Sequence, residues 1–439
     1  MTDKELRVIY DNSGWIRDRD LTDIPCDTIT TGCANHIKVE MRKGPFKKRR
    51  KEVPKPSYRV PTMAEIVRIP FNGIKVASTF SGAGGSCTGY RMAGCRVVWA
   101  NEFVPAAQES YRANASPNCI LDGRDIREVQ ADDILKASKL ERGELDIFDG
   151  SPPCQAFSTA GRREKGWGDK KKYEGGAEQK NEELFFEYVR LLDGIQPKAF
   201  IAENVSGLVK GTAKGFFLEI LQRLKDCGYQ VECRVLDAAW LGVPQHRRRA
   251  IFVGVRDDLN AVPVFPKPLA YQYTVRDALP WLSKVSMRNF SDKNIDLTNR
   301  PCSTIMTTDH DSGFHREPSE IIDDSHENIV KMRIPTGFHG EEWIDPDAKP
   351  YHTVGCSPSS GCGYKGNGGK AEFQNDSGKV TRRKFRIEEL KRICAFPDDF
   401  VLTGTYAKQW ERLGNSVPPV MMKAIASSVV GILNDKTKR

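Results

Sequence analysis

The sequence predicts an α/β fold whose central sheet is followed by a smaller, loop-rich domain. Short apolar runs alternate with amphipathic stretches between residues 74 and 262, which is typical of strands that alternate with helices. The alternation fails over residues 263–380, which are rich in Gly, Pro, Ser, Asp and His. A chain of 439 residues is long enough for one large domain and a smaller one.

Each predicted strand of the first domain is a short run of mostly apolar residues. Apolar runs predict strands at residues 74–79, 96–102, 145–150, 199–205, 229–237 and 249–255. A further strand, third in chain order, is expected to end at Asp125. Helical spacing of apolar residues is clearest at 181–195 and 214–227. We therefore expect a parallel sheet that is covered by helices.

The parts of the chain on either side of these two regions differ from them in composition and residue pattern. Residues 1–73 are polar, basic and punctuated by proline, and they form an N-terminal extension. Residues 381–439 regain the helical pattern, with helices expected at 385–396 and 417–434. We expect this C-terminal segment to return to the first domain.

Bulk composition excludes membrane and secreted classes. Hydrophobic residues make up 39% of the chain and charged residues 28%, which suits a soluble globular protein. No uninterrupted apolar run approaches the ~20 residues that a membrane span requires. The N-terminus lacks the apolar core of a secretory signal, so we expect an intracellular protein.

Positive charge is clustered along the chain, whose formal net charge is +9. The clusters are KKRRK (47–51), KKK (170–172), RRR (247–249) and RRK (382–384). A solvated face accounts for any one run, whereas several runs favour a polyanionic partner.

Cysteine usage predicts reduced thiols and no metal site. The chain has 12 cysteines and no Cys-x-x-Cys pair. The pairs Cys26/Cys33 and Cys356/Cys362 are spaced unlike the ligands of structural zinc.

A glycine-rich segment, STFSGAGGSCTGY (78–90), follows the first predicted strand and precedes a helix. Its glycines let the backbone approach a ligand at the carboxyl end of the strand, although a tight turn alone also accounts for them. Glu102 ends the next strand, where a carboxylate commonly accepts hydrogen bonds from ribose hydroxyls. Asp125 is expected at the end of the third strand, where it could hold an adenine amino group. Together these residues predict an adenosyl pocket.

Cys154 follows two prolines in DGSPPCQAFS (149–158), just after the fourth predicted strand. The thiol could be a small buried apolar group, a metal ligand or a nucleophile. Open α/β sheets bind their ligands at this edge, and two prolines make a stiff turn. This position favours the nucleophile.

Further polar residues are expected at the same edge. Glu203 ends another strand in AENV (202–205), where it could be an acid beside a bound base or a surface carboxylate. Arg247 and Arg249, two apart in VPQHRRRA, are expected on one face of a strand. They could grip a carbonyl or phosphate group, or form a solvated edge.

These segments, in this order, resemble the DNA cytosine-5 methyltransferase family from about Ile74 to Val429. The segments that carry the resemblance are FSGAGG, NE (101–102), DGRDI, GSPPCQAFS, ELFFE, AENV, VPQHRRR, FRIEELKRICAFPDDF and RLGNSVPP. Ser151 departs from the glycine often found before the proline pair, while the prolines and Cys154 are intact. The resemblance implies a Rossmann-like, S-adenosylmethionine-dependent methyltransferase domain and a target-recognition domain at 263–380.

The resemblance also implies roles for the catalytic residues. A target cytosine would leave the helix, because its C5 and C6 atoms are inaccessible in a stacked base. Cys154 would attack C6 as a thiolate, and Glu203 would supply a proton or hydrogen bond to N3. Arg247 would hold the cytosine O2, and Arg249 would position Cys154. The cytosine C5 would then take the methyl group.

The implied cofactor pocket is built on the glycine-rich loop. Phe80 would stack on the adenine, Glu102 would bind the ribose, and Asp125 with Ile126 would contact the adenine edge. The remaining implied pocket residues are Gly82, Ala83, Gly84, Gly85, Phe103, Pro153, Leu184, Asn415 and Val417. Residues 156–180 would form a mobile loop that closes over DNA.

Partners and cellular context follow from the same resemblance. We expect a monomer that binds double-stranded DNA but no membrane, in a prokaryotic or phage-encoded setting in the cytoplasm, with a restriction endonuclease as partner in the same system. A tRNA cytosine-5 methyltransferase and a catalytically silent DNA-binding homologue are the alternatives. The long 263–380 region favours duplex DNA, because reading the major groove requires surface.

Residues 15–69 also echo residues 343–393. WIRDRDLTDIPCDTITTGC matches WIDPDAKPYHTVGCSPSSGC in Trp-Ile and in Pro-x-x-Thr, and YRVPTMAEIVRI (58–69) matches KFRIEELKRI (384–393). One hypothesis is a duplicated end of the recognition domain, which would form a cap or an extra DNA contact. Chance similarity in a polar tail is the alternative.

Overall fold

A computed structural model describes most of the chain outside the basic N-terminal extension and the loop-rich region. The described residues are 54–153, 183–209, 214–280 and 385–437, together with the backbone of short strands elsewhere. Cys154 and most of the loop at 156–180 lie outside them. So do Cys26, Cys33, Cys356 and Cys362 of the two spaced pairs.

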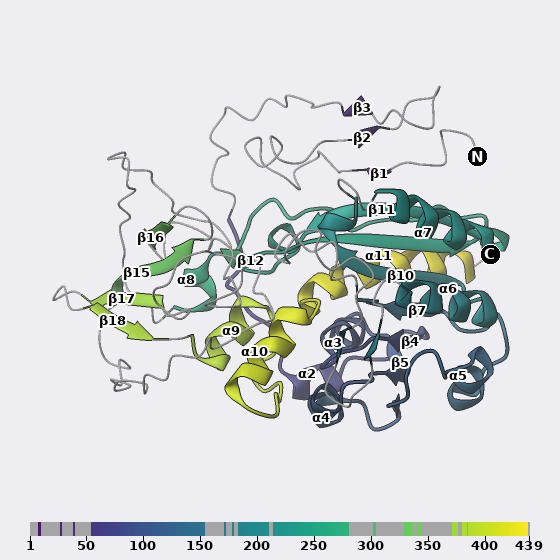
Figure 1. The fold of residues 1–439 in the computed structure, drawn as a ribbon, viewed down its shortest axis with the longest axis horizontal. Helices are drawn as coiled ribbons and strands as arrows, with labels where there is room; N and C mark the ends of the chain where they lie inside the picture. The colour runs from purple at the N-terminus through teal and green to yellow at the C-terminus, as the bar shows by residue number, and fades with distance from the viewer. Residues whose placement is uncertain are drawn as a thin grey trace.

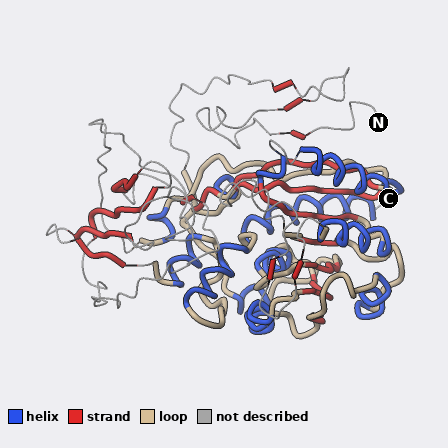
Figure 2. The backbone as a smooth tube through the Cα atoms, in the orientation of Figure 1, coloured by secondary structure: helices blue, strands red, loops and turns tan. Residues whose placement is uncertain are grey.

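The core is an eight-stranded sheet with the order β1-β11-β13-β10-β7-β4-β5-β6. Figure 2 shows its strands side by side, with helices on either side. Its strands are β1 (Val8–Ile9), β4 (Lys75–Thr79), β5 (Arg96–Asn101), β6 (Ile120–Asp122), β7 (Ile147–Gly150), β10 (Ala199–Val205), β11 (Tyr229–Asp237) and β13 (Arg248–Arg256). All six apolar runs predicted as strands are confirmed, and β1 was not predicted.

The expectation of a fully parallel sheet is wrong at β13. Strands β4, β5, β6, β7 and β10 pair in parallel, but β13 runs antiparallel to both β10 and β11. The reason is the connection between β11 and β13, which contains only a short 3₁₀ turn, Ala238–Trp240, and the two-residue strand β12 (Gln245–His246). A parallel crossover needs a longer connection that usually includes a helix, so the chain turns back on itself here.

Helices cover the sheet on two sides (Figure 1). On one side α3 (Gly85–Met92) contacts α11 (Pro419–Thr437), and α4 (Pro105–Asn114) follows β5. On the other, α6 (Leu184–Ile195) contacts both α5 (Ala131–Ser138) and α7 (Lys214–Asp226). The helices predicted at 181–195, 214–227 and 417–434 are therefore confirmed, with small differences in their ends.

Glycines allow α11 to approach α3 closely. A Cβ atom on Gly89 would lie 2.6 Å from both the Met422 Cβ and the Pro419 carbonyl oxygen. A Cβ atom on Gly85 would lie 2.5 Å from the Val417 carbonyl oxygen. Larger residues would force the two helices apart, so the glycines fix the C-terminal segment against the start of α3.

Residues 54–69 dock on the C-terminal segment. The Tyr58 hydroxyl donates to the Arg392 carbonyl oxygen at 2.7 Å, and the Met63 amide donates to Asp399 Oδ1 at 2.7 Å. Lys55 pairs at 2.5 Å with Asp277, which lies in the short helix α8 (Val275–Ala278). This part of the N-terminal extension is thus packed on the rest of the chain.

The helical halves of the internal sequence repeat share one local structure. The third residue of helix α2 (Met63–Val67) is a glutamate, and so is the third residue of helix α9 (Ile387–Ile393). In both helices this carboxylate accepts the amide of the residue that caps the helix, at 2.9 Å. Most of the remaining repeat lies outside the described residues, so the duplication stays a hypothesis.

The loop-rich region contributes a second sheet with the order β16-β15-β17-β18, whose strands pair antiparallel. Its strands are β15 (Ile329–Thr336), β16 (Gly340–Ile344), β17 (Ala371–Asn375) and β18 (Val380–Arg383). Two-stranded pairs are formed by β2 (Asp27–Thr28) with β3 (Lys38–Val39), β8 (Lys171–Lys172) with β9 (Glu178–Gln179), and β12 (Gln245–His246) with β14 (Cys302–Ser303).

One described segment, Tyr406–Asp435, has the length and apolar composition of a membrane span. It comprises α10 (Tyr406–Asn415) and α11, and 56% of its most apolar window is buried inside the protein. Its apolar side chains pack in the core, as the contact of α11 with α3 requires.

Candidate active site

The loop that follows β4 has an unusual backbone. Phe80 has a φ of 53°, Gly82 of 55° and Gly84 of 96°, all in the left-handed region. This conformation costs a residue with a side chain about 1 kcal/mol or more, so Phe80 marks a functional constraint. Gly84 caps the N-terminus of α3, and the Ser81 amide bonds the Asn101 carbonyl oxygen at 2.9 Å. The loop is therefore fixed in this conformation at the end of the sheet.

Glu102 is fixed against this loop. Its Oε2 accepts the Gly82 amide at 2.7 Å and its Oε1 accepts the Val104 amide at 2.8 Å, with only 8% of the residue exposed. Burial raises the pKa of Glu102, while these amides and the charge of Arg412 oppose the rise. Each carboxylate oxygen keeps a lone pair, so the group can accept hydrogen bonds from a ribose diol.

Asp125 lies three residues beyond the end of β6, so the expectation that it ends the strand is wrong. Its carboxylate is engaged by the guanidinium of Arg127, with Nε 3.0 Å from Oδ1 and Nη2 2.6 Å from Oδ2. An adenine amino group would share this carboxylate with Arg127. Ile126 beside it is buried.

The structure places some of the other implied pocket residues at the loop, but not all of them. Ala83 is buried in the loop, and the carbonyl of Val417 faces Gly85 across the α3–α11 contact. Phe103 directly follows Glu102. The described contacts do not join Pro153, Leu184 or Asn415 to the loop, so their part in the pocket stays a prediction.

The turn before Cys154 is held on several sides. A Cβ atom on Gly150 would lie 2.5 Å from Thr79 Oγ1 and 2.6 Å from the Tyr188 ring, so only glycine fits. The Thr79 hydroxyl donates to the Asp149 carbonyl oxygen at 3.1 Å, and Asn204 Nδ2 donates to the Pro152 carbonyl oxygen at 3.2 Å. Neighbouring strands therefore fix the backbone that carries the thiol.

Glu203 and Arg249 form a buried ion pair beside this turn. Arg249 Nε lies 2.8 Å from Glu203 Oε1, and Glu203 is 8% exposed. Burial lowers the pKa of Arg249, and the charge of Glu203 opposes that change. Strand β10 pairs with β7 so that Ala202 faces Gly150, which puts Glu203 at the same sheet edge as the Cys154 turn.

Arg247 precedes β13 rather than lying on it, so the expectation of two arginines on one strand is wrong. The residue is 2% exposed, and burial together with the neighbouring Arg249 lowers its pKa to about 9. The two guanidiniums are nevertheless close enough to interact electrostatically, and both interact with Glu203.

Asp237, the last residue of β11, was missed by the sequence analysis. Its Oδ1 accepts the amides of Ala239 at 3.1 Å and Arg247 at 3.2 Å, and its Oδ2 lies 2.8 Å from His246 Nδ1. Burial raises the pKa of Asp237, but His246 and the other partners outweigh this effect and lower it. Asp237 thus fixes the bend that presents Arg247. The available signal was an aspartate at a strand end, directly before a turn.

Comparisons with known proteins identify the family to which this chain belongs. Residues 74–431 match the family model described as C-5 cytosine-specific DNA methylase. The chain belongs to this family. It transfers a methyl group from S-adenosylmethionine to C5 of cytosine in DNA, and the resemblance seen in the sequence is confirmed.

Individual relatives of this methylase are Type II methyltransferases. M1.HphI of Haemophilus parahaemolyticus is 30% identical over 356 residues, which are 80% of this chain and 85% of the relative. M.MthTI of Methanothermobacter thermautotrophicus is 31% identical over 82% of this chain and 99% of the relative. A solved structure of a putative DNA modification methyltransferase encoded within a prophage (E. coli) matches with a TM-score of 0.51 and 19% identity. It covers 82% of this chain and all of that one, which supports the Rossmann-like fold.

The cysteines that the structure describes with their side chains are poor nucleophiles. They are Cys87, Cys95, Cys119, Cys227, Cys233 and Cys394. Burial raises the pKa of each, to about 11 for Cys95 and about 12 for Cys394, for example. These thiols are therefore protonated at neutral pH and unreactive.

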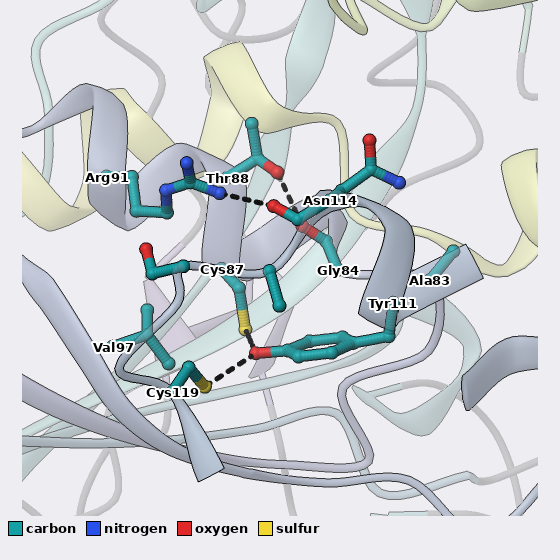
Figure 3. Close-up of a pocket in the computed structure, with 11 residues that line it drawn as sticks. Ala83, Gly84, Cys87, Thr88, Arg91, Val97, Tyr111, Asn114 and Cys119 are labelled. Atoms are coloured by element: carbon teal, nitrogen blue, oxygen red, sulfur yellow. Dashed lines mark hydrogen bonds between the residues drawn. The ribbon is translucent and has the colours of Figure 1, made fainter. Parts of the chain in front are cut away.

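Two of these cysteines line a small pocket behind the cofactor loop of the methylase. Figure 3 shows the Tyr111 hydroxyl between Cys87 and Cys119, with oxygen–sulfur distances of 3.4 Å and 3.3 Å. The loop residues Ala83 and Gly84 form another wall. The pocket holds a satisfied tyrosine and two protonated thiols, which identifies it as packing around α3.

Proposed function

We propose that Cys154 is the nucleophile of this methylase and that Glu203, Arg247 and Arg249 complete its catalytic centre. The observation that carries the proposal is the buried Glu203–Arg249 pair, held at 2.8 Å beside the rigid turn that leads into Cys154. A buried carboxylate with a cationic neighbour at this sheet edge is suited to act on a bound base.

The proposed chemistry begins with the thiolate of Cys154, which forms a bond from sulfur to C6 of a flipped cytosine. The electrons of the C5–C6 double bond move toward N3, where Glu203 supplies a proton. Arg247 binds O2 and stabilises the charge that develops there. Arg249 orients Glu203 through the ion pair. As the resemblance to the family implies, it also positions Cys154.

S-adenosylmethionine supplies the electrophilic methyl group that C5 takes up. A base then removes the C5 proton, the C5–C6 double bond reforms, Cys154 leaves as a thiolate, and N3 returns its proton to Glu203. The chain's own contribution is to hold the thiol, the acid and the target base at one edge of the sheet, away from bulk water.

We also propose how the protein holds the cofactor. The strained loop from Phe80 to Gly85 lets the backbone approach the adenosyl group, and the fixed carboxylate of Glu102 binds the ribose. The residues fit this group, because Glu102 is already oriented by two backbone amides before any ligand binds.

Replacing Glu102 by glutamine should weaken S-adenosylmethionine binding by about 10- to 100-fold, because an amide cannot accept bonds from both amides and the ribose. Isothermal titration calorimetry measures the dissociation constant. Glu109→Gln, an exposed glutamate on α4, is the matched control and should bind normally. Equal affinities for the two variants would refute the assignment.

The proposed substrate is double-stranded DNA with a specific recognition site. The four-stranded sheet β16-β15-β17-β18 lies in the region where family members read DNA, which supports this proposal. We further propose an intracellular monomer that works in a restriction–modification setting, because the named relatives are Type II methyltransferases.

Methyl incorporation into duplex DNA and into tRNA separates the proposal from the tRNA alternative. Sequencing the methylated cytosines of the treated DNA should show modification at one defined sequence context. Preferential labelling of tRNA would support the alternative, and no labelling of either substrate would indicate a catalytically silent homologue.

A further inference from the structure

A second carboxylate of the site, Asp149, has no part in the chemistry proposed above. It lies on β7, directly before the Gly150 turn, and is 1% exposed. Its Oδ2 accepts the Ser78 hydroxyl at 2.7 Å, and its Oδ1 accepts the Tyr90 hydroxyl at 2.9 Å. Within the part of the chain that the structure describes, no cation pairs with Asp149, and burial of an unpaired aspartate is costly, so this position needs an explanation.

The hydrogen bonds of Asp149 join the two halves of the active centre. Ser78 lies on β4, just before the cofactor loop, and Tyr90 lies on α3, the helix that begins in that loop. Asp149 itself precedes the turn of Cys154. The Ser81 hydroxyl of the cofactor loop lies 3.1 Å from Ser78 Oγ and extends the network.

The direction of these bonds suits an ionised carboxylate. A carboxylate is a pure acceptor and can take a hydrogen bond from both hydroxyls at once. A protonated Asp149 would itself have to donate, so one of the two hydroxyls would need to turn away. The network therefore changes when Asp149 gains a proton.

The titration of Asp149 falls near neutral pH. Burial, with a contribution from the charge of Glu203, raises the pKa of Asp149 to about 7, although the Ser78 and Tyr90 hydroxyls oppose the rise.

Other ionisable groups face Asp149 from the neighbouring elements. Burial raises the pKa of Cys87 on α3 to about 12, and it holds the pKa values of Tyr90 on α3 and Tyr188 on α6 well above 10. These three groups stay neutral between pH 6 and pH 8. Glu203 on β10 remains paired with Arg249.

We propose that Asp149 is a positioning residue that couples the cofactor loop to the Cys154 turn through its bonds to Ser78 and Tyr90. In its ionised form it holds β4, α3 and β7 in the arrangement that binds S-adenosylmethionine and presents the thiol. Only the second part of this role, the presentation of the thiol, rests on the proposed function, because cofactor binding can be measured without the nucleophile.

The test uses the full-length protein and compares Asp149→Asn with Asp146→Asn. Asp146 is a matched control, because it is a buried aspartate directly before the same strand, bonded to the Lys75 amide and to Lys198. The dissociation constant of S-adenosylmethionine is measured for both variants and the wild type at pH 6 and pH 8.

At pH 8 we expect Asp149→Asn to weaken cofactor binding about tenfold, because a charge-assisted network is lost. At pH 6 the wild type is largely protonated at Asp149. The dissociation constant of Asp149→Asn divided by that of the wild type should therefore approach one. Both proteins carry Glu102, so any change in the charge of Glu102 with pH affects both dissociation constants and leaves this ratio unchanged. Asp146→Asn should bind like the wild type at both pH values. A ratio for Asp149→Asn that does not change with pH would overturn the proposal, since a purely structural defect behaves in that way.

A second measurement follows adduct formation with duplex DNA that carries 5-fluorocytosine, at saturating cofactor and DNA. Asp149→Asn should slow the adduct several-fold, and the milder Ser78→Ala should show the same defect without adding to it in the double variant. Additive effects, or a normal rate in Asp149→Asn, would refute the coupling. A wild type that forms no adduct would instead contradict the proposed nucleophile, so the two failures are distinguishable.

Discussion

Replacing Cys154 by serine should abolish methyl transfer to DNA, with a fall of at least about 1,000-fold in rate, while S-adenosylmethionine still binds. A serine hydroxyl has a pKa far above that of a thiol and is a much weaker nucleophile without an adjacent base. Incorporation of radiolabelled methyl groups into duplex DNA measures the rate, and calorimetry measures cofactor binding.

Cys119→Ser is the matched control for that variant. Cys119 is partly exposed, but burial raises the pKa of its thiol, and the Tyr111 hydroxyl can bond a serine equally well. Its activity should stay within about twofold of the wild type, because buried or protonated thiols take no part in the reaction. Normal methylation by Cys154→Ser would exclude this thiol as the nucleophile.

Replacing Glu203 by glutamine should have the second largest effect, a fall of about 100- to 10,000-fold in the rate of methyl transfer. A glutamine can donate a hydrogen bond to N3 but cannot release a proton to it, so attack at C6 loses its acid. It also leaves the buried Arg249 guanidinium without its 2.8 Å ionic partner. Single-turnover kinetics at saturating DNA and cofactor isolate this step from binding.

Glu232→Gln tests whether such a loss is specific to Glu203. Glu232 lies on β11 of the same sheet and pairs with Arg234 at 3.0 Å, so the variant removes an equivalent charge away from the site. The rate should change little, because an ion pair at a partly exposed position contributes only about 0–1 kcal/mol. Equal losses in the two variants would mean that Glu203 acts through stability alone.

The strands of the core could be predicted because each buried run is short, apolar and bounded by polar or small residues. Strand β10, for example, has the bounds that the sequence predicted, Ala199–Val205. Strand direction was predicted wrongly at β13, since a run of apolar residues has the same pattern in either direction. Only the short β11–β13 connection, which contains a 3₁₀ turn and β12 but no α-helix, indicates the reversal.

The parts of the candidate site that could be predicted are those in which a characteristic residue lies at or directly after the end of a predicted strand. The glycine loop and Glu102 were found in this way, and the structure brings them together through the bond from Gly82 to Glu102. Asp149 was missed because its partners are distant in sequence, whereas Asp237 was missed although its partners lie only 2 to 10 positions away. The Ser78–Asp149 bond spans 71 positions, and no local pattern records such a contact.

The strands of the second sheet were also missed. Segments such as β16 and β17 are short and lie among Gly, Pro and Asp residues, so they lack the sustained alternation that identifies a strand. The sequence therefore predicted the strands of the central sheet better than the strands of the sheet proposed to read DNA.

The central claim is a covalent bond between Cys154 and C6 of the target cytosine. Duplex DNA that contains 5-fluorocytosine at the recognised site tests it most directly, because fluorine cannot leave as a proton does and the adduct is trapped. With S-adenosylmethionine present, a stable protein–DNA complex should form, and mass spectrometry of its peptides should locate the DNA on Cys154. A protein that methylates ordinary DNA but forms no adduct, or an adduct on another residue, would contradict the account.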